Sequence, residues 1–381
     1  MDRSPIWRWL VASMASVLVA ARPAQAFLRF NDGTDQIFVT GTVATGYDSN
    51  IFASKGGAGD TTTNGSLSLE YQRRAGYIGV NASLAWNIGR FDKHTGQDFA
   101  NPSASAEFTK ETGRTTGSLQ LNAARQSSAD TAANERTTSM NYGANLNWKY
   151  PVVERFTLSG ALGWSQTDYV NSPGLTNLST YTANIDLFYV YTTERDLFGG
   201  YRIRLSDTSA NTQDVDQDIH FGVNGQILPK LTGNISVGWQ VRQSTGPGGV
   251  SLGQFEDLTA SGSATWSYSK KLNFTGQISK DFSTTSTDIT TDSLTVNLAA
   301  SYAYSAKWSA TANVGYGLNK FLGAAGGGRV DYDLSWGVGV NYTQSDHFKA
   351  SLVYGGFENW SNAAQANYFR NTLTLTLTSR W

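Results

Sequence analysis

The chain has 381 residues, a formal net charge of −1 and no cysteine. The lack of cysteine excludes disulfides and thiolate metal sites, and the balanced charge argues against a nucleic-acid partner. Charged residues make up only 15% of the chain, below the roughly 25% typical of soluble domains.

The first residues have the pattern of a secretion signal. Arg3 and Arg8 precede an apolar run that extends from Trp9 to Ala21, and Ala24-Gln25-Ala26 has the small-x-small pattern of a signal-peptidase site. We therefore predict a signal peptide over residues 1–26 and a short periplasmic lead-in over residues 27–35. No later stretch approaches the roughly 20 apolar residues of a helical membrane span, which leaves a closed barrel as the membrane-spanning alternative.

Residues 36–381 read as a succession of alternating segments, each the length of a membrane-crossing strand. Long polar connections are predicted near residues 48–63, 87–98, 126–136, 167–178, 207–216, 243–254, 282–291, 320–329 and 357–366, and one short turn lies between each long connection and the next. The strict alternation predicts an all-β, antiparallel up-and-down transmembrane barrel of about 18 strands, with long extracellular loops and short periplasmic turns. A secreted all-β sandwich or solenoid is the alternative, but no short sequence repeat supports a solenoid.

The last strand has one apolar and one polar face. Leu373, Leu375, Leu377 and Trp381 share one parity, and threonines occupy the other. A strand that ends on a C-terminal aromatic resembles the closing strand of bacterial outer-membrane barrels, where the aromatic is part of the assembly signal. Ser379 departs from that pattern, because an apolar residue is common at its position.

The inward parity is dominated by Ser, Thr, Asn, Gln and Gly, which favours a water-filled lumen that hydrogen-bonds hydroxylated solutes. Few charges point inward: Glu70, Glu107, Asp186, Arg202 and Arg204. Arg202 and Arg204 are expected to face Asp186 on the preceding strand. That group would form either a charge-selective constriction or, as we favour, a structural ion pair.

The chain has few residues for catalysis or metal binding. His94 and His347 fall in connections, and His220 faces inward without an obvious Ser or Asp partner. Asp214, Asp216 and Asp218 alternate near an outer loop, where a solvated acidic loop is favoured over a cation site. We therefore predict a non-enzyme without catalytic residues, metal site or cofactor.

A short motif follows the first predicted strand: Tyr47, Asp48, Ser49, Asn50, Ile51 and Phe52. This run resembles the N-terminal signature of the outer-membrane barrel family known as beta-barrel porin 2, and the resemblance would extend from about Thr40 to Trp381. Members of that family often accompany exopolysaccharide export systems, which implies a passage for polymer. Ile51 and Phe52 either fold over the lumen or pack on the barrel rim.

Three functions follow from these patterns. The leading hypothesis is an outer-membrane channel for a hydrophilic substrate, involved in exopolysaccharide export. A general or sugar-selective diffusion porin and a non-conducting surface barrel are the alternatives. The expected partners are outer-membrane lipid and lipopolysaccharide, the barrel-assembly machinery, polysaccharide and periplasmic export proteins, with no nucleic acid.

Overall fold

The computed structural model describes residues 26–381, except residues 75, 134, 171 and 173. The predicted signal peptide therefore lies, apart from Ala26, outside the described residues. Within the described part of the chain, no helix is long and apolar enough to cross a membrane.

The described residues contain nineteen strands and three single-turn 3₁₀ helices, joined by turns and loops. The strands are β1 (Leu28–Phe30), β2 (Asp35–Asp48), β3 (Asp60–Arg73), β4 (Gly79–Phe91), β5 (Phe99–Lys110), β6 (Thr116–Asp130), β7 (Glu135–Val153), β8 (Phe156–Tyr169), β9 (Leu178–Thr192), β10 (Arg195–Thr208), β11 (Gln213–Leu228), β12 (Leu231–Gly246), β13 (Val250–Ser267), β14 (Leu272–Thr284), β15 (Thr290–Ala303), β16 (Trp308–Phe321), β17 (Val330–Thr343), β18 (Phe348–Ser361) and β19 (Tyr368–Arg380). The helices are η1 (Thr95–Gln97), η2 (Pro247–Gly249) and η3 (Ala364–Ala366).

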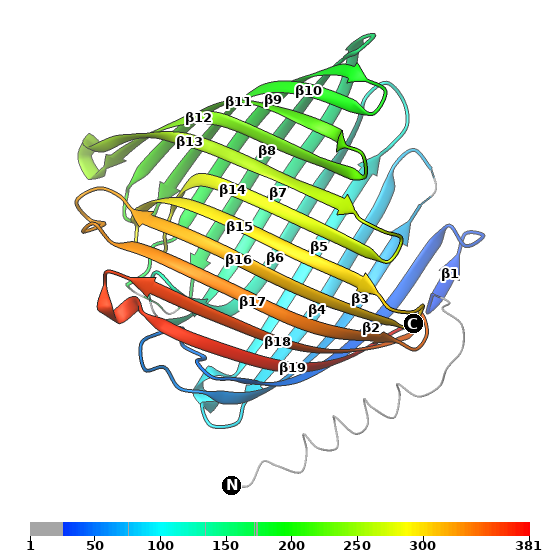
Figure 1. Ribbon diagram of the computed structural model, residues 1–381, viewed down its shortest axis with the longest axis horizontal. Helices are drawn as coiled ribbons and strands as arrows, with labels where there is room; N and C mark the ends of the chain where they lie inside the picture. Colours follow the sequence, from blue (N-terminus) through cyan, green and yellow to red (C-terminus); the bar gives the residue numbers. More distant parts are fainter. Residues whose placement is uncertain (1–25, 75, 134, 171, 173) are drawn as a thin grey trace.

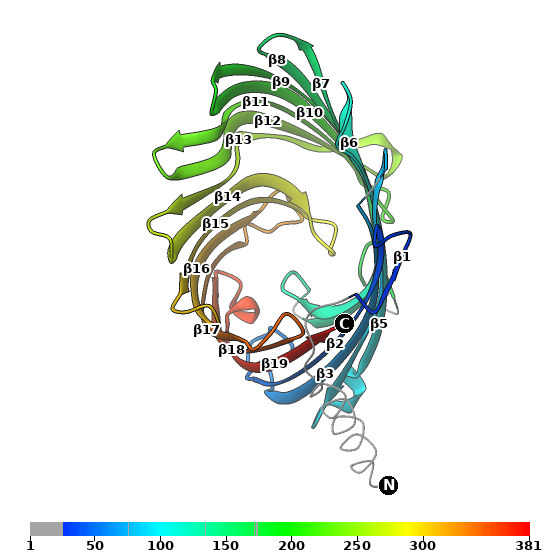
Figure 2. The same ribbon diagram turned by 90° about the vertical axis from the view of Figure 1, so that its right-hand side faces the viewer.

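Each strand from β2 to β19 pairs antiparallel with its neighbours in sequence, and β19 pairs with β2 to close the sheet. Setting aside the three-residue β1, the 19 described strands leave 18 in the wall, which confirms the predicted barrel. Figure 1 shows the C-terminus and β1 at the end of the barrel with the short turns, and Figure 2 views the wall from that end.

The predicted lead-in contains β1, whose Leu28–Phe30 segment pairs with Asp35–Ile37 of β2. Trp381 exchanges two backbone hydrogen bonds with Val39, of 2.8 and 2.9 Å. The closing strand and β1 therefore follow one another along the same edge of β2, so the seam of the barrel is hydrogen-bonded down to its periplasmic end.

The two faces of the wall differ in polarity, because successive side chains of a strand point alternately outward and into the lumen. On β11, Ile219 and Phe221 are 56% and 66% exposed on the outer face, whereas Asp214, Asp216 and Asp218 are buried on the luminal face. Aromatic side chains gather near the short turns, where Trp266 packs against Tyr268 and Phe274. An apolar outer band bounded by such aromatics is the surface expected of a barrel in a bilayer.

The outer connections are shorter than predicted. The expected loop at 207–216, for example, is reduced to residues 209–212 between β10 and β11. Above the apolar band both faces of a strand are polar, so alternation of hydrophobicity ends there although the backbone ladder continues. The sequence pattern therefore marks the height of the lipid band and not the length of the strands.

The wall opens between β13 and β14 in its outer half. Their pairing ends at Ala260 and Lys280, although β13 continues outward to Val250 and β14 to Thr284. The two strands diverge at this point (Figure 2). Residues 281–292, which comprise the ends of β14 and β15 and the turn between them, are called the inner hairpin below.

Candidate functional site

The inner hairpin lies against the luminal side of the wall formed by β9 to β12. Its strands contact Arg204 of β10 and Arg242 of β12, and its turn contacts the outer loops: the Thr176 backbone N–H donates to the Ser286 carbonyl at 2.8 Å, and the Thr212 hydroxyl donates to the Asp288 carboxylate at 2.6 Å. Phe282 is only 2% exposed although it shares the parity of lipid-facing Phe274 and Ile278. The hairpin therefore forms a second layer inside the barrel and narrows its outer half.

Six charged side chains hold the inner hairpin to the wall, and we call them the luminal charge cluster: Arg202, Arg204, Asp214, Asp216, Arg242 and Asp281. Arg202 and Arg204 each donate two hydrogen bonds of 3.0 and 3.2 Å to the Asp281 carboxylate of the hairpin. Arg204 also donates to Asp216 and to the Phe282 carbonyl, both at 2.6 Å.

Arg242 is the buried centre of this cluster, with a side chain only 1% exposed. It donates to both oxygens of Asp216, at 2.6 and 2.8 Å, and to Asp214 at 3.3 Å. It also donates to the Ser283 carbonyl of the inner hairpin at 3.1 Å. Charges taken out of water in this way are stable only when their hydrogen bonds are satisfied, so the cluster fixes the hairpin in one position.

The predicted solvated acidic loop is wrong. Asp214, Asp216 and Asp218 lie on β11 and are 1%, 1% and 4% exposed. The arginine and histidine side chains of β10 to β12 hold them. Their spacing of two along a strand directs all three to the lumen, where cations from neighbouring strands reach them.

The predicted pairing of Arg202 and Arg204 with Asp186 is also wrong, although all three residues lie on the luminal face. The register places Gly200 opposite Asp186 and Arg202 opposite Asn184. Asp186 instead accepts from His220 Nε2 at 2.8 Å. Asp281, the actual partner of the arginines, lies 79 residues beyond Arg202 on a hairpin whose inward fold has no local sequence signal.

His220 does have acidic partners, contrary to the prediction. Its two ring nitrogens lie 2.8 Å from Asp186 of β9 and 2.6 Å from Asp218 of β11, so the imidazole bridges two carboxylates across β10. Gly200 leaves room for this contact, because a Cβ there would collide with the Asp186 carboxylate. The arrangement ties β9, β10 and β11 together across the luminal surface.

The other two predicted luminal charges, Glu70 and Glu107, lie away from the luminal charge cluster and have other partners. Glu70 pairs with Arg380 of the closing strand at 2.7 Å, and Glu107 accepts from Gln120 at 2.8 Å. The Glu70–Arg380 pair spans the seam from β3 to β19 across β2, because Arg380 is opposite Thr40 and Thr40 is opposite Ser68 of β3. The predicted charges therefore divide between the seam, β5–β6 and the inner-hairpin wall.

The motif loop packs on the rim. Asp48 pairs with Arg370 at 2.6 Å, and the Ser49 hydroxyl accepts from the Asn371 N–H at 2.7 Å. Asn50 is buried and donates to the carbonyls of Ser54 and Phe369.

The apolar end of the motif is also held at the rim. Ile51 is fully buried, and the Phe52 ring lies edge-on to His94 with centroids 5.5 Å apart. Tyr47 is exposed on the outer face. Of the two placements considered for Ile51 and Phe52, these contacts with adjacent strand ends favour the rim.

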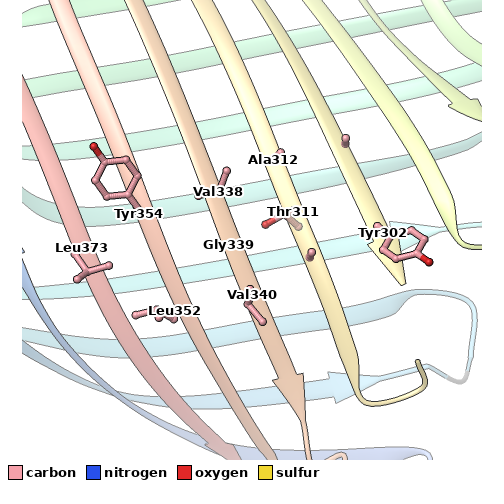
Figure 3. A pocket seen from close by; sticks show the side chains of 11 residues that line it. Tyr302, Thr311, Ala312, Val338, Gly339, Val340, Leu352, Tyr354 and Leu373 are labelled. Carbon is pink, nitrogen blue, oxygen red and sulfur yellow. The ribbon is translucent and has the colours of Figure 1, made fainter. Parts of the chain in front are cut away.

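The four residues of the predicted assembly signal lie on the outer face of β19 and just beyond it. Leu373 and Leu375 are 48% and 43% exposed, Leu377 is half-buried, and Trp381 stacks on His347 with ring centroids 4.4 Å apart. Leu373 lines a shallow groove of about 430 Å³ in the outer wall, together with Tyr302, Val338, Leu352 and Tyr354 (Figure 3). This apolar surface is the part of the wall that faces lipid.

The rest of the lumen is hydroxyl- and amide-rich, as predicted. A polar pocket of about 350 Å³ lies on β6 to β8 and includes Ser128, Thr137, Asn141 and Tyr169. Another, of about 430 Å³, lies on β12 to β15 and includes Asn234, Ser261, Gln277 and Asn297. Both offer neutral donors and acceptors to a solute in the lumen.

Comparison with known proteins agrees with this architecture. The family described as "Putative beta-barrel porin 2" matches residues 217–381, which confirms the resemblance over that part of the chain; the motif at residues 47–52 lies outside it. No curated protein sequence matches the chain significantly.

Solved outer-membrane proteins share the fold at low sequence identity. Pseudomonas aeruginosa OccK2 (OpdF) in complex with glucuronate superposes with a TM-score of 0.51 at 12% identity, covering 93% of this chain and 100% of the other. Pseudomonas aeruginosa OpdK with vanillate gives a TM-score of 0.50 at 10% identity, covering 91% and 99%. The chain is therefore similar in fold to outer-membrane porins along almost its whole length.

Proposed function

We propose that this porin-like outer-membrane barrel is a channel for the passive diffusion of small hydrophilic solutes. The observation that carries the proposal is the inner hairpin: a polar lumen with a second layer against its wall has the construction of a pore with a constriction. An 18-stranded wall is wide enough to enclose water, and the Ser, Thr and Asn lining exchanges hydrogen bonds with a solute as readily as with water.

Export of a polysaccharide, implied by the family resemblance, stays a prediction. A polymer needs a continuous opening for the whole time of export, so the inner hairpin would have to leave the lumen. Removal of the signal peptide and interactions with lipopolysaccharide, the barrel-assembly machinery and periplasmic export proteins likewise stay proposals that rest on the barrel fold.

Single-channel recording in planar bilayers tests the diffusion proposal. We expect the purified protein to give a steady conductance in KCl. A variant in which residues 284–290 are replaced by a two-glycine turn should conduct more, because the second layer is shortened. A matched variant with residues 323–328 shortened controls for the loss of a loop.

The heat-dependent gel mobility of each variant shows whether the barrel has folded. Absence of conductance in folded wild type and in the folded 284–290 variant would contradict the channel and favour a non-conducting barrel. In the parent cell, loss of polymer export on deletion of the gene would instead favour the export role.

A further inference from the structure

One carboxylate of the inner hairpin occupies a site made by two arginines. Asp281 accepts a pair of hydrogen bonds from Arg202 and a second pair from Arg204, all of 3.0 to 3.2 Å. Paired, planar N–H···O contacts are the geometry by which guanidinium groups recognise carboxylates. The wall therefore presents a built carboxylate site, which the chain itself fills.

This site is open to the lumen, unlike the rest of the cluster. The side chains of Arg202, Arg204 and Asp281 retain 23%, 16% and 25% of their exposure, against 1% for Arg242. A solute carboxylate in the lumen can therefore approach the arginines from the exposed side of Asp281. The buried contacts of Arg242 with Ser283 and Thr284, on the turn side of Asp281, would hold the hairpin while this exchange takes place.

The two arginines differ in the contacts that they make besides Asp281. Arg204 is also anchored by Asp216 and by the Phe282 carbonyl, at 2.6 Å each. The carboxylate that Arg202 contacts is Asp281, so Arg202 is the member of the pair that a solute can take over most completely. The site thus combines Arg204, which other contacts hold in place, with Arg202, whose carboxylate partner a solute can replace.

Atoms beside this pair have unmade hydrogen bonds. Among the described residues, Arg202 Nε, Asn184 Oδ1 and Asp218 Oδ2 are buried and lack a protein partner. Asn184 and Asp218 lie directly opposite Arg202 on the two adjacent strands. These atoms supply one donor and two acceptors that are closed to the lumen while Asp281 is in place, and they suit hydroxyl groups next to a carboxylate that displaces it.

We propose that Arg202 and Arg204 form a luminal binding site for hydroxylated carboxylates, such as uronic acids, and that the solute carboxylate displaces Asp281. The exchange replaces one carboxylate by another, so the charge balance of the arginines is kept and no buried cation is left unpaired. The inner hairpin loses its link to Arg202 in the same step. This inference rests on the proposed channel only for the route by which the solute arrives.

Isothermal titration of the detergent-solubilised barrel tests the site without requiring conductance. The probe is galacturonate, and galactose is its uncharged counterpart. Asp281→Asn removes the competing charge and should bind galacturonate at least tenfold more tightly than wild type, with no change for galactose. Adding Arg202→Gln to Asp281→Asn should abolish that gain.

Asp292→Asn is the matched control, because Asp292 lies on the same hairpin but pairs with Lys280 and Lys320. It should bind galacturonate as wild type does. Asp281→Ser replaces Asp281→Asn if the latter does not assemble. Equal affinity of folded wild type and the Asp281 variant for galacturonate would overturn the site, as would an equal gain for galactose.

Conductance of the same preparations separates this inference from the proposed function. Tight galacturonate binding by a barrel that does not conduct would support the carboxylate site and refute the channel. A conducting barrel in which the Asp281 variant binds no galacturonate would refute the site and leave the channel standing.

Discussion

Removal of the Arg242 guanidinium measures how strongly the inner hairpin is held. In Arg242→Gln, Asp214 loses its arginine and keeps hydrogen bonds from Ser244 and Thr284, whereas Asp216 keeps Arg204. Breaking a buried pair from one side costs about 3 to 5 kcal/mol, because a charge is left without its partner. Only one of the two carboxylates loses its last cation. We therefore expect Arg242→Gln to lower the free energy of unfolding by about 3 kcal/mol.

Reversible urea unfolding in lipid vesicles, followed by tryptophan fluorescence, gives this free energy. Arg74→Gln is the control, because Arg74 is exposed beside a periplasmic turn and should cost less than about 0.5 kcal/mol. Adding Asp214→Asn to Arg242→Gln removes the unpaired charge and should recover about 1 kcal/mol or more. If Arg242→Gln lowers the free energy of unfolding as little as Arg74→Gln does, the luminal charge cluster is not buried from water and does not hold the inner hairpin tightly.

Two further substitutions test the wall itself. Leu375→Arg places a charge on the lipid face and should cost about 2 to 4 kcal/mol, whereas the luminal Thr374→Arg should be far milder; equal losses in vesicle unfolding would contradict the parity of β19. Gly200→Ala introduces a Cβ that collides with Asp186 and lies 2.8 Å from the Ile185 carbonyl. It should cost about 1 to 3 kcal/mol, and an unchanged free energy of unfolding would mean that the His220 bridge is loose.

The barrel could be predicted from the sequence because one physical rule acts on every strand. Lipid outside and water inside force an alternation such as that of Leu373, Leu375 and Leu377 with threonines between them, and closure then requires the terminal strands to pair. The strand count and the closing pair of β19 and β2 follow from local patterns added around the ring. Luminal contacts follow no such rule, because they join residues that only the curvature of the wall brings together.

The inner hairpin could not be predicted, but one residue carries a sign of it. Lys280 continues the lipid-facing parity of Phe274 and Ile278, and a charge is expensive there unless the strand has left the bilayer. In the structure Lys280 lies where β13 and β14 separate, and it pairs with Asp257 at 2.6 Å and Asp292 at 3.0 Å. A charge on the apolar face of a barrel strand is therefore a signal for a break in the wall, although it does not identify Asp281 as the residue that reaches the arginines.

The position of that break also limits how the channel can move. Leu258, on the outer face of β13, is 58% exposed. The next residues on that face toward the outer end of the strand are Glu256 and Gln254, whose side chains hydrogen-bond each other at 2.7 Å. The unpaired edge of β13 thus begins where the outer surface becomes polar, so water can satisfy the backbone groups that β14 leaves unpaired. The same separation at the height of Ile278 would leave those groups in lipid, at several kcal/mol each. Any motion of the inner hairpin is therefore confined to the segment beyond Lys280. The half of the wall toward the short turns, where β13 and β14 are paired, stays closed whether the lumen is open or blocked.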